Sequence, residues 1–134
     1  MELLARLGHF FEQVRSDADF ATFAGELRRH QVSYYIYFVT TGNVNFVMAN
    51  DDVISIKSAR GLLRVCAEVS HCLTRAAVIR HFAGAINFEQ YCQDLASAGV
   101  FKWTVDLEDN TRHYWSKAVS YTHLRAHETS LHLV

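Results

Sequence analysis

The stretch Asp19-Phe-Ala-Thr-Phe-Ala-Gly-Glu-Leu27 returns, 68 positions later, as Asn87-Phe-Glu-Gln-Tyr-Cys-Gln-Asp-Leu95. Few residues are identical, but each copy begins with a residue that can cap a helix. Each then places apolar side chains at positions i, i+3, i+4 and i+7, which is typical of a helix that buries one face. Self-similarity at a fixed offset indicates that the chain contains two copies of one structural unit.

The pattern on either side of these stretches is also shared. In each copy a helix is expected before the quoted stretch, and two strands are expected after it, where apolar and polar residues alternate. Ser70 is a suitable N-cap, Gly84 and Gly99 are suitable helix ends, and Gln31 stands at the position equivalent to Gly99. The expected elements are helices at 2–15 and 71–83 and strands at 32–40, 43–48, 100–108 and 111–116.

The segment between the copies adds further strand signals. Residues 53–56 alternate as a strand does, whereas 63–69 fits a strand or a helix, and periodicity does not decide between them. We therefore predict a single α+β domain over residues 1–118, with helices packed on a largely antiparallel sheet. Its helix-helix-strand-strand repeats span about 2–48 and 71–116, and we expect an approximate two-fold axis to relate them.

The two copies agree on one face of their first long strand and disagree on the other. Successive side chains of a strand point to opposite faces of the sheet, so each face can be compared separately. One face is apolar in both copies and is assigned to the core: Tyr35, Tyr37 and Val39 correspond to Trp103, Val105 and Leu107. The other face is apolar only in the first copy: Tyr34, Ile36 and Phe38 correspond to Lys102, Thr104 and Asp106.

The apolar face formed by Tyr34, Ile36 and Phe38 is therefore expected to be covered. Three covers are open: another part of this chain, a second copy in a homo-oligomer, or a ligand or nucleobase that stacks on the aromatic rings. The charge balance counts against nucleic acid, since 13 Lys and Arg are offset by 14 Asp and Glu. We expect no nucleic-acid partner.

Three cysteines and one uncharged stretch bear on location. Cys66, Cys72 and Cys92 form no CxxC pair and cannot all pair within the chain, which favours a reducing, cytoplasmic setting.

Residues 30–50 lack Asp, Glu, Lys and Arg, but Thr40-Thr41-Gly42-Asn43 interrupts them. That interruption predicts a hairpin instead of a membrane-spanning helix, and we expect neither a membrane partner nor a targeting segment.

Residues that could bind a metal ion are present without the spacing of a structural site. No pair of them has the spacing of zinc-binding motifs, so we predict no metal site, and no cofactor is expected. These residues are Cys66, His71, Cys72, His81, Cys92 and His113.

Acid–base chemistry is the other option that the sequence offers. Asp106, Glu108 and Asp109 lie near the second hairpin turn with His113 across from them, and a carboxylate beside an imidazole is a workable catalytic pair. However, Asp, Asn and Thr at 109–111 are also what a turn requires, and we favour the turn. No nucleophile elbow, phosphate-binding loop or dinucleotide fingerprint is found, so no catalytic residue is predicted.

The last residues of the chain differ in character from the rest. Ser120-Tyr-Thr-His-Leu-Arg-Ala-His-Glu-Thr129 resembles the in-frame translation of a sequencing adapter. We therefore predict that residues 119–134 are an artefactual tail, and we leave the three histidines of that tail out of the functional argument.

The second copy carries a family signature. Ala98-Gly-Val-Phe-Lys-Trp103, followed by Val105-Asp106 and the aromatic pair Tyr114-Trp115, resembles the YbcV-like proteins, known as domain of unknown function 1398. Asn87-Phe88 resembles the segment that leads into this signature, and the resemblance covers most of residues 10–116. It implies a small α+β domain without an assigned activity, and some members carry the label phage envelope protein.

The chain departs from the family pattern in two places. Arg112 and His113 stand where the family tends to have Thr-Cys before its aromatic pair. Family members also continue past that pair into another turn and strand, whereas here Lys117-Ala118 lead into the suspect tail. We therefore expect the native C-terminal strand to be missing, which would leave a sheet edge or an apolar face uncovered.

These observations favour an uncharacterised, small soluble protein of bacterial or phage origin that is not an enzyme and acts by binding or by self-association. The candidate interface is Tyr34, Ile36 and Phe38. The alternative is a small-molecule-binding protein or an enzyme with a cleft between the two repeats. The residues expected near such a cleft are Trp103, Asp106 and His113.

Overall fold

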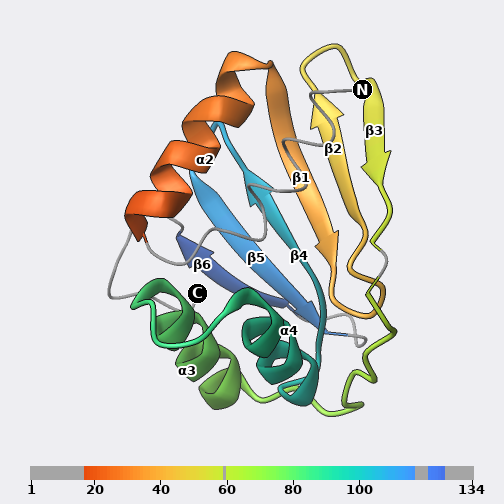
Figure 1. Cartoon of the computed structure of the whole chain (residues 1–134), viewed down its shortest axis with the longest axis vertical. Helices are drawn as coiled ribbons and strands as arrows, with labels where there is room; N and C mark the ends of the chain where they lie inside the picture. The colour runs from red at the N-terminus through yellow and green to blue at the C-terminus, as the bar shows by residue number, and fades with distance from the viewer. Residues whose placement is uncertain (1–16, 59, 117–120, 126–134) are drawn as a thin grey trace.

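Helices and strands alternate in blocks along the chain of this computed structural model, which describes residues 17–58, 60–116 and 121–125. The elements are, in order, α2 (Asp17–Arg29), β1 (Val32–Phe38), β2 (Val44–Met48), β3 (Val53–Ile56), α3 (His71–Phe82), α4 (Phe88–Ser97), β4 (Val100–Asp106), β5 (Thr111–Ser116) and β6 (Tyr121–Arg125) (Figure 1). The expected helix at 2–15 lies outside the described residues.

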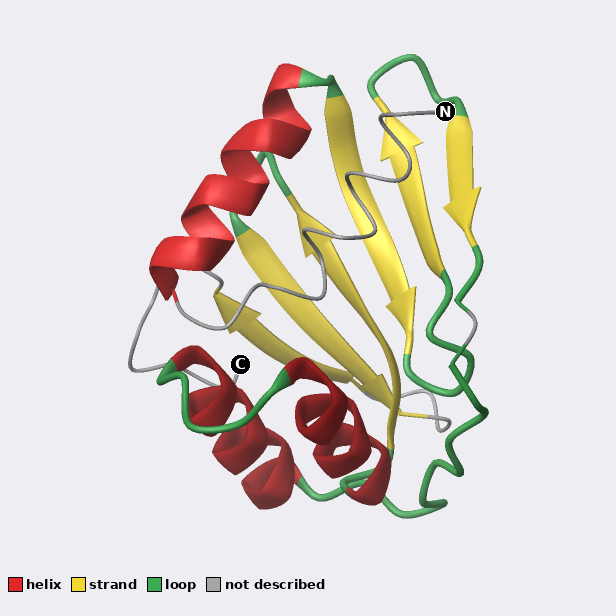
Figure 2. Ribbon diagram, viewed as in Figure 1, coloured by secondary structure: helices red, strands yellow, loops and turns green. Residues whose placement is uncertain are grey.

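The described strands form one antiparallel sheet in the order β3-β2-β1-β4-β5-β6. The central pair, β1 and β4, joins the two halves of the chain, with Tyr35 opposite Val105 and Tyr37 opposite Trp103. From that pair each half runs outward to its own edge of the sheet. The three described helices all lie on one face of the sheet, so the predicted α+β class is confirmed (Figures 1 and 2).

The core lies between this sheet and its helices. The apolar stripes of α2 and α4 are buried against the strands, because the i, i+3, i+4, i+7 spacing puts those side chains on one side of each helix. The strand face predicted to be inward is buried in both halves: Tyr35, Tyr37, Val39, Trp103, Val105 and Leu107.

Side chains cap the starts of two helices as predicted. The Ser70 hydroxyl accepts a hydrogen bond from the Leu73 amide at 3.1 Å, which begins α3. The Asn87 side-chain oxygen accepts one from the Gln90 amide at 2.7 Å, which begins α4. Each bond satisfies an amide that has no partner inside its helix.

Left-handed backbone follows the helices and forms the turns. Gly84 ends α3 at φ 77° and Gly99 follows α4 at φ 88°, the conformation that glycine adopts with the least strain. Gln31, the position equivalent to Gly99, is also left-handed at φ 64°. The hairpin residues Gly42 and Asn110, likewise equivalent in the predicted repeat, have φ of 79° and 60°.

Two boundaries differ from the prediction. Helix α2 begins at Asp17, two residues before the expected cap at Asp19. Residues 63–69 form neither a strand nor a helix, and the loop that contains them runs along the lower edge of the view toward α3 (Figure 2). Hydrogen bonds hold this loop to the end of α4, one of them from the Cys66 amide to the Ala96 carbonyl at 2.9 Å. The conformation of this loop is therefore determined by tertiary contacts. The periodicity of apolar residues in the sequence does not predict such contacts.

Part of the predicted tail belongs to the sheet. Strand β6, Tyr121–Arg125, pairs with β5 in antiparallel register, with His113 opposite His123. We expected the strand that follows β5 in family members to be missing from this chain. Residues 121–125 occupy the position beside β5 instead. The adapter origin of residues 119–134 stays a prediction. Among the described residues, no helix has the length and apolar character needed to cross a membrane.

Candidate functional site

Five of the six residues singled out in the sequence lie on the outer face of the sheet, which is turned away from the helices. Tyr34, Ile36 and Phe38 of β1 form what we call the β1 row, and Tyr34 lies opposite Asp106 of β4. The same register joins Ile36, through β4, to His113 of β5. The structure therefore places these residues on one surface.

The apolar part of the outer face extends beyond the β1 row. Tyr34, with 38% of its surface exposed, lies opposite Val47 of β2, and Val47 lies opposite Val53 of β3, with 57% exposed. None of the described helices lies on this side of the sheet (Figure 1). These residues and the β1 row together make an apolar strip that no described segment covers.

The other half of the outer face has partners of its own. The Trp115 indole N–H donates to the Thr104 hydroxyl at 3.2 Å, and the Lys102 ammonium lies 5.3 Å from the centre of the indole ring. A lysine over an aromatic face is attracted to the ring while its charge stays accessible to water. This half therefore tolerates solvent better than the apolar strip does.

Asp106 serves the turn between β4 and β5. One of its carboxylate oxygens accepts hydrogen bonds from the backbone amides of Glu108 at 2.8 Å and of Asp109 at 3.0 Å. The register places His113 opposite Thr104, whereas Asp106 lies opposite Thr111. The geometry thus agrees with the turn interpretation, because the carboxylate is engaged by the backbone.

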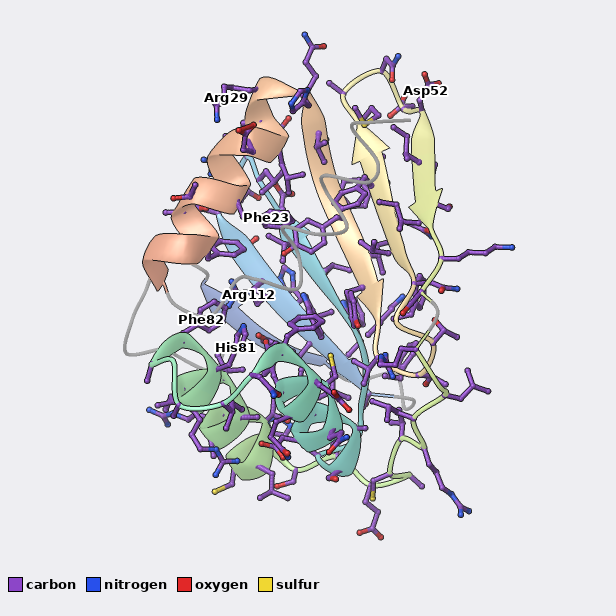
Figure 3. All side chains as sticks on the ribbon, in the orientation of Figure 1. Phe23, Arg29, Asp52, His81, Phe82 and Arg112 are labelled. Carbon is purple, nitrogen blue, oxygen red and sulfur yellow. The ribbon has the colours of Figure 1, made fainter. Side chains whose placement is uncertain are left out.

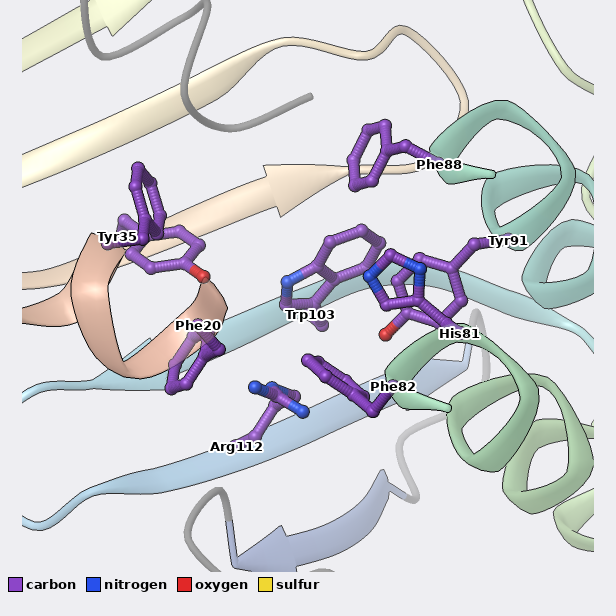
Figure 4. Close-up of a pocket in the computed structure, with 9 residues that line it drawn as sticks. Phe20, Tyr35, His81, Phe82, Phe88, Tyr91, Trp103 and Arg112 are labelled. Carbon is purple, nitrogen blue, oxygen red and sulfur yellow. The ribbon is translucent and has the colours of Figure 1, made fainter. Parts of the chain in front are cut away.

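Trp103, the sixth candidate, lies on the inner face of the sheet. Its ring stacks on Tyr37 at 4.4 Å between centroids, beneath the helices, so Trp103 does not share a face with Asp106 and His113. It lines a small pocket of about 20 Å3, room for about one water molecule, between α2 of the first half and α3 and α4 of the second (Figure 4). The lining side chains are Phe20, Phe23, Tyr35, His81, Phe82, Phe88, Tyr91, Trp103 and Arg112.

Arg112 is the charged group of this inner pocket. Its side chain is only 2% exposed, and its guanidinium carbon lies 4.5 Å from the centre of the Phe20 ring and 4.3 Å from that of Phe82. Figure 3 shows Arg112, Phe82 and His81 close together between the sheet and the helices. Burial lowers the pKa of Arg112, but the neighbouring Tyr114, Tyr91 and Tyr35 outweigh this effect and raise it. No carboxylate of the described side chains lies within ion-pair distance of the guanidinium.

Two tyrosines and a histidine continue the polar part of the pocket. The hydroxyl oxygens of Tyr91 and Tyr114 are 2.5 Å apart and share a hydrogen bond. The His81 ring stacks on Tyr91 at 4.0 Å with the two planes nearly parallel. Burial raises the pKa of both tyrosines above the usual value, although the positive charge of Arg112 opposes that shift. Both hydroxyls are therefore neutral at physiological pH.

The sequence prediction did not include Arg112 among the candidate site residues. The available signal was the alternation along β5, which puts Arg112 on the same face as the buried Tyr114. The equivalent position in the first repeat is the buried Val44, so an arginine there enters a position that is apolar in the other half.

Cysteines and metal ligands supply no further site within the described chain. No three His, Cys, Asp or Glu side chains of the described residues lie close enough together to share a metal ion. Cys92 is buried and its thiol donates to the Tyr37 hydroxyl at 3.6 Å, whereas Cys66 and Cys72 are exposed free thiols.

Comparison with known proteins identifies relatives over most of the chain. Residues 8–124 match the family described as protein of unknown function DUF1398, so the match reaches into β6. The chain is 36% identical over 106 residues to the uncharacterized protein YcgX of Escherichia coli K12, which is 79% of each chain. It is 34% identical over 116 residues to the uncharacterized protein YbcV of the same strain, 87% of this chain and 85% of that one.

Proposed function

The chain belongs to the DUF1398 family of proteins of unknown function, and we propose that it is a non-catalytic domain that self-associates through the outer face of its sheet. The observation that carries this proposal is the apolar strip, the β1 row with Val47 and Val53, on a face that no described helix covers. Of the three covers that the sequence left open, a second copy agrees best with this arrangement.

The hydrophobic effect favours covering the apolar strip, which occupies one half of the outer face of the sheet. An antiparallel sheet that exposes one face to water normally presents polar side chains there, as Lys102 and Thr104 do. The apolar strip instead leaves Tyr34 and Val53 in contact with water. A two-fold axis through the strip would pack it against itself, with the polar half at the rim, which is the usual anatomy of an interface.

The test is a measurement of mass by light scattering after size-exclusion chromatography, over a range of protein concentrations. We expect the wild-type protein to be a dimer, and Ile36→Lys to be a monomer of unchanged fold, because the lysine would bury a charge in the interface. Gln93→Lys is the matched control, since it adds the same charge on the exposed surface of α4, on the helix side. A wild-type monomer at every concentration refutes the proposal, as does a dimer that survives Ile36→Lys.

The finer expectations from the sequence belong to the same proposal. A cytoplasmic location is supported by the exposed free thiols of Cys66 and Cys72, which an oxidising compartment would not preserve. The internal repeat is supported by the order of the strands, which is the same from the central pair to either edge. The absence of a nucleic-acid partner and a link to phages are kept as predictions.

A further inference from the structure

A hollow opens at the end of the sheet where β1 turns into β2. Its volume is about 470 Å3, which is within the usual range of ligand pockets. The Phe38 amide donates to the Asn43 carbonyl at 2.9 Å and closes the turn, and the Val39 amide donates to the Phe101 carbonyl at 2.8 Å, which holds the start of β4 alongside. The described lining side chains are Phe38, Thr40, Thr41, Asn43, Asn45, Ser55, Ile56, Lys57 and Phe101.

Neutral hydrogen-bonding side chains line this hollow in fixed orientations. The Ser55 hydroxyl donates to the Asn45 side-chain oxygen at 2.8 Å, and the Ser58 backbone amide donates to the Asn43 side-chain oxygen at 2.9 Å. Because both oxygens are engaged, the orientation of each amide is set and its NH2 group is left to donate to a ligand. The Thr41 hydroxyl accepts from the Asn43 backbone amide at 3.1 Å and still has its own proton to donate. The polar groups are therefore positioned before any ligand binds, which lowers the entropic cost of binding.

Two phenylalanine rings supply the apolar part of the hollow. Phe38 and Phe101 are both half-buried, so each keeps part of its ring surface accessible to a ligand. The Lys102 ammonium lies 5.4 Å from the centre of the Phe101 ring, on the side of β4. Flat apolar surfaces thus lie beside groups that form hydrogen bonds without carrying a charge.

We propose that this hollow binds a sugar ring, with the C–H face of the sugar on Phe38 and its hydroxyls on Asn43, Asn45 and Ser55. A pyranose ring presents apolar C–H groups on its faces and hydroxyls around its edge. Each sugar hydroxyl both donates and accepts, so it matches side-chain amides and hydroxyls better than it matches charged groups. The volume of about 470 Å3 holds a ring of this size.

This proposal goes beyond self-association and does not rest on it. The most exposed apolar side chains of the apolar strip, Tyr34 and Val53, are joined by the strand register and lie at the opposite end of the strip from Phe38. Two copies that pack at that end leave the hollow open, so either proposal can fail without the other.

The first experiment uses the isotope-labelled wild-type chain and follows the asparagine side-chain NH2 signals by NMR. The probes are glucose, galactose, mannose and cyclohexanol, which has a ring of similar size with a single hydroxyl. We expect at least one hexose, at millimolar concentration, to shift the Asn43 and Asn45 signals and to leave that of Asn50, in the β2–β3 turn outside the hollow, unchanged. Cyclohexanol should bind about tenfold or more weakly, because it leaves most of the amide groups without a partner. A failure of every hexose to shift these signals, or equal binding of cyclohexanol, overturns the proposal without any variant.

Variants then test the assigned residues, each first shown by circular dichroism to be folded. Asn45→Ala removes one amide and is expected to weaken hexose binding about fivefold to tenfold, as the loss of a hydrogen bond does. Phe38→Leu keeps an apolar side chain without the flat ring and is also expected to weaken binding. Gln93→Ala, which removes an exposed amide from α4 on the helix side, is the matched control and should leave binding unchanged. Undiminished hexose binding in folded Asn45→Ala and Phe38→Leu also overturns the proposal.

Discussion

Replacing Gly99 with alanine is expected to destabilise the fold strongly, because two separate constraints meet at this residue. Its backbone is left-handed at φ 88°, and a Cβ placed there would lie 2.4 Å from the Glu68 carbonyl oxygen. The loop that carries Glu68 does not move away freely, since the Ser70 amide donates to the Ala98 carbonyl at 2.8 Å. The new methyl group would therefore push against backbone that is fixed on both sides.

The magnitude follows from adding these two effects. A left-handed conformation costs an alanine about 1–2 kcal/mol, and overpacking costs about 1–3 kcal/mol, with a gain of about 0.4–1 kcal/mol from the stiffer unfolded chain. We expect the free energy of unfolding to fall by about 3 kcal/mol. For a denaturant slope of about 2 kcal/mol/M, that lowers the urea midpoint by about 1.5 M.

Urea unfolding, followed by circular dichroism and by tryptophan fluorescence, measures this change. Gly25→Ala is the matched control: Gly25 lies inside α2, no atom beyond its neighbours and its own helix backbone lies within 4 Å of an added Cβ, and alanine there should stabilise the helix by about 1 kcal/mol. The two glycine substitutions should therefore shift the midpoint in opposite directions. An unchanged midpoint for Gly99→Ala would show that the loop or φ relaxes at little cost, which contradicts the reasoning above.

Two further predictions follow from buried groups. The folded protein should lose stability as the pH rises above about 10, because Tyr91 and Tyr114 ionise near that value when unfolded and only at higher pH when folded. Stability should be independent of these groups below pH 10, and an ultraviolet titration in which every tyrosine ionises near pH 10 without unfolding would contradict this. A thiol reagent should label Cys66 and Cys72 in the native protein, and Cys92 only after unfolding; rapid native labelling of Cys92 would show that the core around it opens.

Much of the fold could be predicted from short stretches of sequence. Alternation along the two long strands identified the buried faces, including Tyr35 and Trp103, because a strand repeats every two residues whatever it packs against. The caps Ser70 and Asn87 were predictable for a similar reason, since the bond that each makes closes within its own helix. The loop at 63–69 was not predictable, because its backbone bonds to distant residues, among them Ala96.

The candidate site was only partly predictable. The β1 row was identified by comparing the two copies, and the register then placed it on the same face as Asp106 and His113. Trp103 was grouped with those two residues, although strand alternation turns it to the other face. Arg112 was noted only as a departure from the family pattern, since a charged residue in a strand gives no sign by itself of being buried.

The sequence by itself determined where the described helices and most strands lie, where two of these helices are capped, and which strand side chains point inward, because these properties depend on neighbours within a few residues. The tertiary structure decided that all described helices share one face of the sheet, and that Arg112 meets Phe20 and Phe82. Those contacts join elements far apart in the chain, and their geometry depends on how whole layers pack. The uncovered strip and the charged pocket both follow from that packing.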